Sequence, residues 1–243
     1  MPSDERWPSD MSAVEHSAGS LRDQVYQSIR ADLMAGKITP TERLSEERLA
    51  QIYGVSRTPV REALARLQSD GLVQRGEHGL YPYRPRLEDL NGLYELRILL
   101  ELQGIRRVID TEYARHDADI LGAELEKWHA LRTHSLEPDS SFVTLDEEFH
   151  TALLVSAGNP ALTEALATVN AKIRPVRMFD YLTPAGIEAT IDEHIAIAEL
   201  VLDNKLPQAF ESLRAHIDDG RLVVVEHARQ ALSLAALASA VRY

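Results

Sequence analysis

Apolar residues recur at every fourth position in residues 21–35, a spacing that predicts an amphipathic helix with one buried face. Ser20 precedes this stretch and Gly36 follows it, as expected of residues that cap a helix. Residues 45–53 begin with a serine followed by acidic residues, and residues 58–69 carry a stripe of valine and leucine. Three short helices are therefore expected in this first part of the chain.

The third helix is expected to begin with Thr58 as its cap and Pro59 as its first residue, because proline fits that position. Gly71 should end it. Two short extended runs, LVQR and LYPY, then flank the turn sequence GEHG, which predicts a β-hairpin. Three helices followed by a hairpin within residues 20–85 match a winged helix-turn-helix in size and order.

Every segment beyond the prolines at 82 and 85 has helical spacing, and none alternates as a strand does. Breaks rich in proline, glycine and asparagine separate the segments. We expect helices near residues 87–110, 117–134, 139–157, 160–179, 185–203 and 206–237. The predicted fold class is mainly α, with a winged helix-turn-helix followed by an all-helical bundle of six or seven helices.

Charge is distributed unevenly along the chain. The formal net charge is −12, which by itself argues against a nucleic-acid partner. Residues 20–85, however, hold 10 Lys and Arg against 8 Asp and Glu, whereas residues 86–243 hold 15 against 26. The acidic excess therefore lies outside the winged helix-turn-helix, and DNA stays a plausible partner.

Composition narrows the class of protein further. The absence of cysteine excludes a disulfide framework and a thiolate metal site, and it suits the cytoplasm. No apolar run reaches the roughly 18 residues that span a bilayer, so no membrane partner is expected. Residues 1–19 lack the apolar core of a signal peptide and are rich in Ser, Pro, Asp and Glu, which predicts a disordered arm.

The turn after the second helix and the helix that follows carry the residues suited to reading DNA. Arg57 and Arg61 share one helix face, and arginine makes bidentate contacts with guanine. Thr58 lies beside the free N–H groups of the helix start, which suit a phosphate oxygen. The hairpin tip would lie along the neighbouring groove. The candidate DNA contacts are Arg43, Arg57, Thr58, Arg61, His78 and Gly79.

The run GVSRTPVREALARLQSDGLV, from residue 54, resembles the signature of the GntR superfamily of transcriptional regulators. The run ELRILLE, from residue 95, resembles the start of the FCD effector domain of its FadR-like branch. This resemblance covers residues 20–235 and implies a ligand-responsive regulator, by default a repressor, rather than an enzyme. Glu47 stands where family members often carry arginine, so the resemblance leaves open one contact with the DNA backbone, or part of the operator preference.

Four polar residues on three expected helices of the bundle suggest a metal site. Asp146 and His150 are four positions apart, and His194 and His216 lie in apolar stripes. Burying such groups is unfavourable unless something binds them together. Three imidazoles and one carboxylate suit zinc, with nickel or manganese as alternatives. The resemblance supports the set, because one FCD subgroup carries Asp-x-x-x-His and then a histidine on each of two later helices.

The resemblance also implies that a small organic acid occupies the open positions of this ion. Such an acid needs cationic or hydrogen-bonding partners. Asn170, Arg174, Arg177 and Tyr181 recur on one face of an expected helix, and Arg97 of the ELR run is a further candidate. The histidines outside the metal set are interpreted as surface residues: His16, His78, His116, His129, His134 and His227.

Together these features predict three parts: an arm over residues 1–19, a DNA-binding domain over 20–85, and an effector-, metal-binding and dimerisation domain over 86–237. A single recognition helix reads only a few base pairs, so a homodimer on a near-palindromic double-stranded operator is expected. Two alternatives stay open. The ion itself could be the signal, or the site could belong to a metal-dependent hydrolase, although no HExxH-type base accompanies it.

Overall fold

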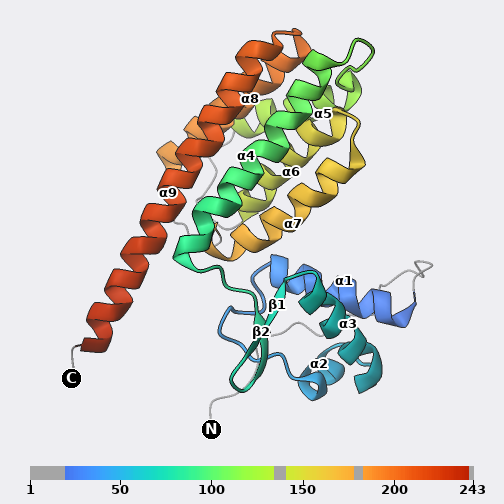
Figure 1. Cartoon of the computed structure of the whole chain (residues 1–243), viewed down its shortest axis with the longest axis vertical. Helices are drawn as coiled ribbons and strands as arrows, with labels where there is room; N and C mark the ends of the chain where they lie inside the picture. Colours follow the sequence, from blue (N-terminus) through green and yellow to red (C-terminus); the bar gives the residue numbers. More distant parts are fainter. Residues whose placement is uncertain (1–19, 134–140, 178–182, 241–243) are drawn as a thin grey trace. The chain divides into compact units, whose positions relative to one another are not determined.

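The computed structural model describes residues 20–133, 141–177 and 183–240, and the chain divides into two compact units between Tyr83 and Arg84. The first unit contains three helices and a two-stranded antiparallel sheet (Figure 1). The second contains six helices and no strand in its described residues. The predicted fold class is confirmed.

The first unit has the order expected of a winged helix-turn-helix. Its elements are α1 (Leu21–Met34), α2 (Glu46–Ile52), α3 (Arg57–Ser69), β1 (Val73–Gly76) and β2 (Gly79–Pro82). The strands pair from Val73 opposite Pro82 to Gly76 opposite Gly79, which leaves two residues in the turn. An isolated bridge joins Leu44 and Leu80 and places the segment before α2 along this hairpin.

Side-chain caps begin the first two helices as the sequence indicates. The hydroxyl of Ser20 accepts a hydrogen bond from the backbone N–H of Asp23, and Ser45 does the same for Arg48. Gly54 has a φ of 64°, in the left-handed region that glycine enters without a steric penalty. This residue therefore ends α2 and turns the chain into α3.

The expected start of α3 is wrong by two residues. The helix begins at Arg57, and its N-cap is Ser56, whose backbone is extended with a ψ of 166°. Thr58 and Pro59 are therefore the second and third helical residues. Proline is tolerated there because the first four N–H groups of a helix have no intrahelical partner.

The core of the first unit follows the predicted apolar stripes. Ile29 of α1 packs with the buried face of α3, where Val60, Leu64 and Leu67 have at most 1% of their surface exposed. Leu21 departs from the pattern because 53% of its surface is exposed at the start of α1. Helix ends extend past the core, so spacing alone overestimates burial there.

The second unit is the helical bundle. Its helices are α4 (Leu87–Asp110), α5 (Ala118–Arg132), α6 (Ser141–Ser156), α7 (Pro160–Arg177), α8 (Pro184–Leu202) and α9 (Leu206–Ala240). α4 lies beside α9, and α5 lies beside α8 (Figure 1). Trp128 and Phe149 meet edge to face in the core, with 5.7 Å between ring centroids. No helix in the described residues is both long and apolar enough to cross a membrane.

Candidate metal centre and nucleic-acid interface

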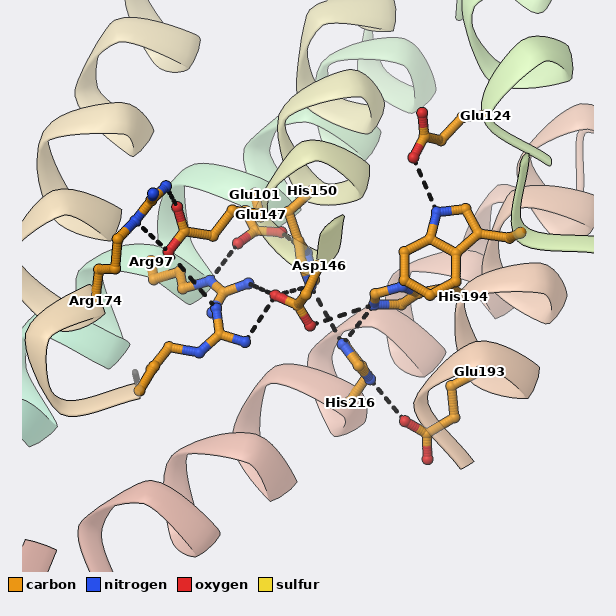
Figure 2. Close-up of polar contacts among 12 residues, drawn as sticks. Arg97, Glu101, Glu124, Asp146, Glu147, His150, Arg174, Glu193, His194 and His216 are labelled. Carbon is orange, nitrogen blue, oxygen red and sulfur yellow. Dashed lines mark hydrogen bonds and ion pairs between the residues drawn. The ribbon is translucent and has the colours of Figure 1, made fainter. Parts of the chain in front are cut away.

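Helices α6, α8 and α9 bring one aspartate and three histidines together inside the bundle (Figure 2). Asp146 and His150 come from α6, where a spacing of four residues places both on one face. His194 comes from α8 and His216 from α9. One ligand atom from each of the four lies within 4.8 Å of the others. The structure thus places all four expected metal ligands at one point.

The histidine nitrogens face one another at short range. The Nε2 atom of His216 lies 3.2 Å from Nε2 of His150 and 3.0 Å from Nε2 of His194. The carboxylate of Asp146 approaches the same nitrogens, with 3.7 Å to His150 and 3.8 Å to His194. Because four potential donors of electron pairs converge, this point suits a cation.

Two further carboxylates decide which nitrogen of each ring carries the proton. Glu101 lies 2.5 Å from Nδ1 of His150, and Glu193 lies 2.6 Å from Nδ1 of His216 (Figure 2). In the neutral rings Nδ1 then donates a hydrogen bond to its carboxylate, and Nε2 presents a lone pair to the centre. Two lone pairs that face each other repel unless a cation or a shared proton lies between them.

Burial opposes protonation of two of the three rings, those of His150 and His194. It lowers the pKa of His150, and it holds the pKa of His194 well below its usual range. Burial opposes ionisation of Glu101, but the charge of Arg97 and the hydrogen bonds from His150 and Arg97 outweigh it and lower the pKa of Glu101 to about 2. Neutral imidazoles beside ionised carboxylates are the protonation states that a divalent ion requires of its ligands and their partners.

Arginines from α4 and α7 lie beside the cluster. Nη2 of Arg177 lies 2.8 Å from Oδ2 of Asp146, and Nη2 of Arg97 lies 3.7 Å from the same oxygen. Nε of Arg97 donates a hydrogen bond of 2.7 Å to Glu101. Arg97 has only 4% of its surface exposed, so it is a core residue and not surface charge.

Two other expected effector residues, Asn170 and Arg174, lie on the same helix as Arg177. Arg174 donates hydrogen bonds to the carboxylate of Glu147, and Asn170 is buried one turn earlier on α7. Within the described residues, Oδ1 of Asn170 and Nη1 of Arg177 are buried without a hydrogen-bond partner. Nη1 of Arg177 lies 4.0 Å from Oε1 of Glu147, beyond hydrogen-bond distance, so both atoms retain the capacity to form a hydrogen bond with a ligand. Tyr181 lies outside the described residues.

Three carboxylates of this site were not expected from the sequence: Glu101, Glu147 and Glu193. The sequence does contain an indication of the Arg97–Glu101 pair, because Glu101 follows Arg97 by four positions on a mostly apolar stripe of α4. The side chain of Glu193 is half exposed and adjacent to His194, and nothing in the sequence connects it with His216 on another helix. Only the packing of α8 against α9 brings that pair together.

The interpretation of His116 as a surface residue is wrong. Its ring is half-buried, and Nδ1 lies 2.7 Å from Oγ of Ser156. Burial lowers the pKa of His116 to about 4. His78, His129 and His227 are exposed as expected, and His16 and His134 lie outside the described residues.

The expected DNA contacts lie on α3 and at the hairpin. Arg57, Thr58 and Arg61 are exposed on α3, and His78 is exposed in the turn of the hairpin. Gly79 has a φ of 141°, and a Cβ at this position would come within 3.0 Å of Nε of Arg43. The structure therefore brings Arg43 against the hairpin, and the backbone conformation of this position favours glycine.

Arg57 and Arg61 meet a carboxylate that the sequence did not single out. Glu46, the first residue of α2, accepts hydrogen bonds of 2.8 Å from both Nε and Nη2 of Arg61. It also accepts a bond of 3.3 Å from Nη2 of Arg57. Glu47, the residue that departs from the family pattern, is exposed beside it.

Family comparison agrees with this architecture. The model of bacterial regulatory proteins of the gntR family matches residues 21–79, and the model of the FCD domain matches residues 92–219. The chain belongs to the gntR family. This gntR protein, which carries an FCD domain, is a DNA-binding transcriptional regulator and not an enzyme.

Individual relatives align with most of the length of this gntR protein. YdhC, an HTH-type transcriptional regulator of Bacillus subtilis (strain 168), is 30% identical over 80% of this chain and 87% of its own length. The HTH-type transcriptional repressor RspR of Escherichia coli (strain K12) is 27% identical over 73% of this chain and 77% of its own. A crystal structure described as a putative GntR regulator from Rhodococcus sp. RHA1 shares the fold, with a TM-score of 0.72 and 22% identity, over 86% of this chain and 99% of that one.

Proposed function

We propose that this gntR regulator is a homodimeric repressor whose affinity for its operator is set by a small organic acid, bound at a divalent ion in the FCD domain. The observation that carries this proposal is the convergence of three Nε2 atoms, two of them on rings that carboxylates hold and the third on the ring of His194, which stacks on Phe149. The repressor assignment is supported by the similarity to RspR, which is named as a repressor.

The proposed ligands of the ion are Asp146, His150, His194 and His216. Imidazole and carboxylate donors suit zinc, and they also suit nickel or manganese. Four protein ligands leave positions open on an ion that accepts five or six. When bound, the ion supplies positive charge and open positions for an oxygen ligand. Glu101 and Glu193 would keep the rings of His150 and His216 oriented toward it.

The charge of the site favours an anionic effector. Arg97, Arg174 and Arg177 are balanced by Glu101, Asp146 and Glu147, all in ion pairs. A divalent ion adds two positive charges, of which the half-exposed Glu193 offsets one, and the remaining excess of buried positive charge is unfavourable. A carboxylic acid reduces that excess, and Nη1 of Arg177 is a donor without a hydrogen bond that can meet it.

The DNA-binding assignment rests on the exposed arginine face of α3. We place Arg57, Thr58 and Arg61 at the major groove and Arg43, His78 and Gly79 at the neighbouring backbone or groove. A homodimer would engage two half-sites and gain affinity from both. Its formation is supported by exposed apolar side chains on α4 and α9, which are Leu96, Leu99, Leu222 and Val223.

Native mass spectrometry of the protein purified from its host tests the proposal in one measurement. We expect a dimer that retains about one divalent ion per subunit, and a small acid whose mass identifies it. Metal-stripped protein on operator DNA then separates the roles of ion and acid. If the ion alone switches DNA binding over a regulatory concentration range, the ion is the signal and the organic-acid proposal is wrong.

A further inference from the structure

We propose that Glu46 is a positioning residue that holds Arg61 as the guanine-reading side chain of α3. The sequence selectivity of this regulator then depends on a carboxylate that need not contact DNA. The inference rests on the proposed placement of α3 in the major groove. It adds a specificity-determining residue to that placement.

The contact between Glu46 and Arg61 is bidentate. Nε and Nη2 of Arg61 donate to Oε1 and Oε2 of Glu46, each at 2.8 Å, so two parallel hydrogen bonds fix the plane of the guanidinium. Arg57 shares only one oxygen of this carboxylate, at 3.3 Å through Nη2. Arg61 is therefore held in one orientation, whereas Arg57 is held at one atom.

Glu46 pairs with one edge of the Arg61 guanidinium and leaves the other edge free to contact a base. A guanidinium has five N–H groups, and the Nε–Nη2 side uses two of them. The outer side, formed by Nη1 and the second N–H of Nη2, still presents two parallel donors. O6 and N7 of guanine accept this pair in the major groove. The geometry thus allows Arg61 to contact Glu46 and a guanine at the same time.

Stability does not account for this contact. The side chains of Arg57 and Arg61 are 61% and 63% exposed, and exposed ion pairs contribute little to folding. An arginine whose orientation is set before binding, however, loses less side-chain freedom when it meets a base. A neighbouring carboxylate also repels phosphate, so it favours base edges over the DNA backbone.

The position of Glu46 is itself fixed by the fold. It is the first residue of α2, directly after the cap Ser45, where the helix dipole favours a negative charge. Leu49 and Ala50 anchor α2 in the core. The hydroxyl of Tyr53 donates a hydrogen bond of 2.6 Å to Asp32 of α1. These contacts anchor α2, and α2 in turn fixes the position of the Glu46 carboxylate.

The neighbouring residue offers a matched control. Glu47 lies on the same helix turn and is exposed, and no contact with Arg57 or Arg61 is found for it. Glu46→Gln and Glu47→Gln remove the same charge at adjacent positions. Both replace a two-oxygen acceptor with an amide that has one acceptor and one donor group, but only Glu46→Gln does so at the contact with Arg61. Any effect of net charge on DNA affinity appears in both variants.

The test measures selectivity with defined DNA probes. Duplexes are first selected from a random library by the full-length wild-type protein. Binding to the best selected duplex and to a random duplex is then measured at one salt concentration for wild type, Glu46→Gln, Glu47→Gln and Arg61→Ala. We expect the ratio of the two affinities to fall about tenfold in Glu46→Gln, within the discrimination of one bidentate arginine–guanine pair. Glu47→Gln should keep the ratio within about twofold of wild type, since Arg57 and Arg61 pair with Glu46 and a changed contact with the DNA backbone affects both duplexes alike.

The results separate the role of Glu46 from the role of Arg61. Binding of Glu46→Gln to the random duplex, at the level of Glu47→Gln, shows that the variant is folded. Equal ratios in the two glutamine variants overturn the role of Glu46, and an unchanged ratio in Arg61→Ala overturns the assignment of Arg61 as the reader. If the wild type selects no sequence at all, the proposed DNA-binding function fails together with this inference.

Discussion

At the scale of single residues, the environment of the second ring nitrogen distinguishes the histidines of the cluster. Glu101 holds Nδ1 of His150, and Glu193 holds Nδ1 of His216. Nδ1 of His194 is buried without a hydrogen bond, and its ring instead stacks on Phe149 with 3.9 Å between centroids. Packing therefore orients the third ring where hydrogen bonds orient the other two.

Removal of His194 should empty the proposed metal centre. In His194→Ala one of four ligands is lost, so we expect the retained metal to fall well below one ion per subunit, with DNA binding partly preserved. Inductively coupled plasma mass spectrometry of dialysed protein measures this. His129→Ala, an exposed histidine of the same unit, is the control. Full metal occupancy in His194→Ala would remove this residue from the ligand set.

His116 should make stability depend on pH between about 6.5 and 4. Burial lowers its folded-state pKa to about 4, below the usual 6.5 of histidine, so the unfolded chain takes up a proton first as the pH falls. The stabilisation is present above pH 6.5 and is lost toward pH 4. Because the ring is partly exposed, we expect only about 1 kcal/mol at pH 5.

Urea unfolding at pH 7 and pH 5 checks this expectation. His116→Gln retains a hydrogen-bonding group but does not titrate, so the variant should lose about 1 kcal/mol less than wild type between the two pH values. His129→Gln serves as the exposed control. Equal losses in wild type and His116→Gln would show that His116 contributes nothing to the pH dependence.

At the scale of elements, α4 links the interior of the bundle with its surface. Its buried face carries Arg97 and Glu101 toward the metal cluster, and its opposite face exposes Leu96 and Leu99. The side chain of Leu99 is among the most exposed large apolar groups, at 68% of its surface. A helix that is buried on one face and apolar on the other is typical of one that also packs against a second chain.

A charge on the exposed face of α4 should weaken the proposed dimer. Leu99→Glu would bury an unpaired carboxylate in that interface, so we expect monomers at concentrations where wild type is dimeric. Sedimentation velocity over a dilution series measures the shift. Ala123→Glu places the same charge on an exposed position of α5 and should leave the dimer intact. A dimer unaffected by Leu99→Glu would place the interface elsewhere.

At the scale of the whole molecule, two units with different charge carry different tasks. Residues 20–85 have a small excess of basic residues, and residues 86–243 have a large acidic excess. The phosphate backbone of DNA repels an acidic FCD domain. This repulsion favours contact with DNA through α3 and the hairpin. A ligand in one unit can change DNA affinity only by binding the two states of the protein unequally.

The acid and the operator should weaken each other's binding by the same factor. With metal-loaded protein and citrate as the probe, we expect operator affinity to fall about 5- to 150-fold, the usual range of such coupling. Calorimetry of citrate binding with and without operator must then give the same factor. Metal-stripped protein is the control and should show no response. Loss of operator binding on metal addition alone would favour a metal sensor.

The sequence by itself determined the helices, the hairpin and the division of charge, because periodicity, caps and turn glycines act over a few residues. It also indicated the four proposed metal ligands, since Asp146 and His150 are four positions apart and His194 and His216 lie in apolar stripes. Only the tertiary structure paired Glu101 with His150, Glu193 with His216, and Glu46 with Arg61. These partners come from different helices, and only the packing of those helices sets the distances between their side chains. The start of α3 and the burial of His116 were decided in the same way, by contacts and backbone geometry that no spacing in the sequence encodes.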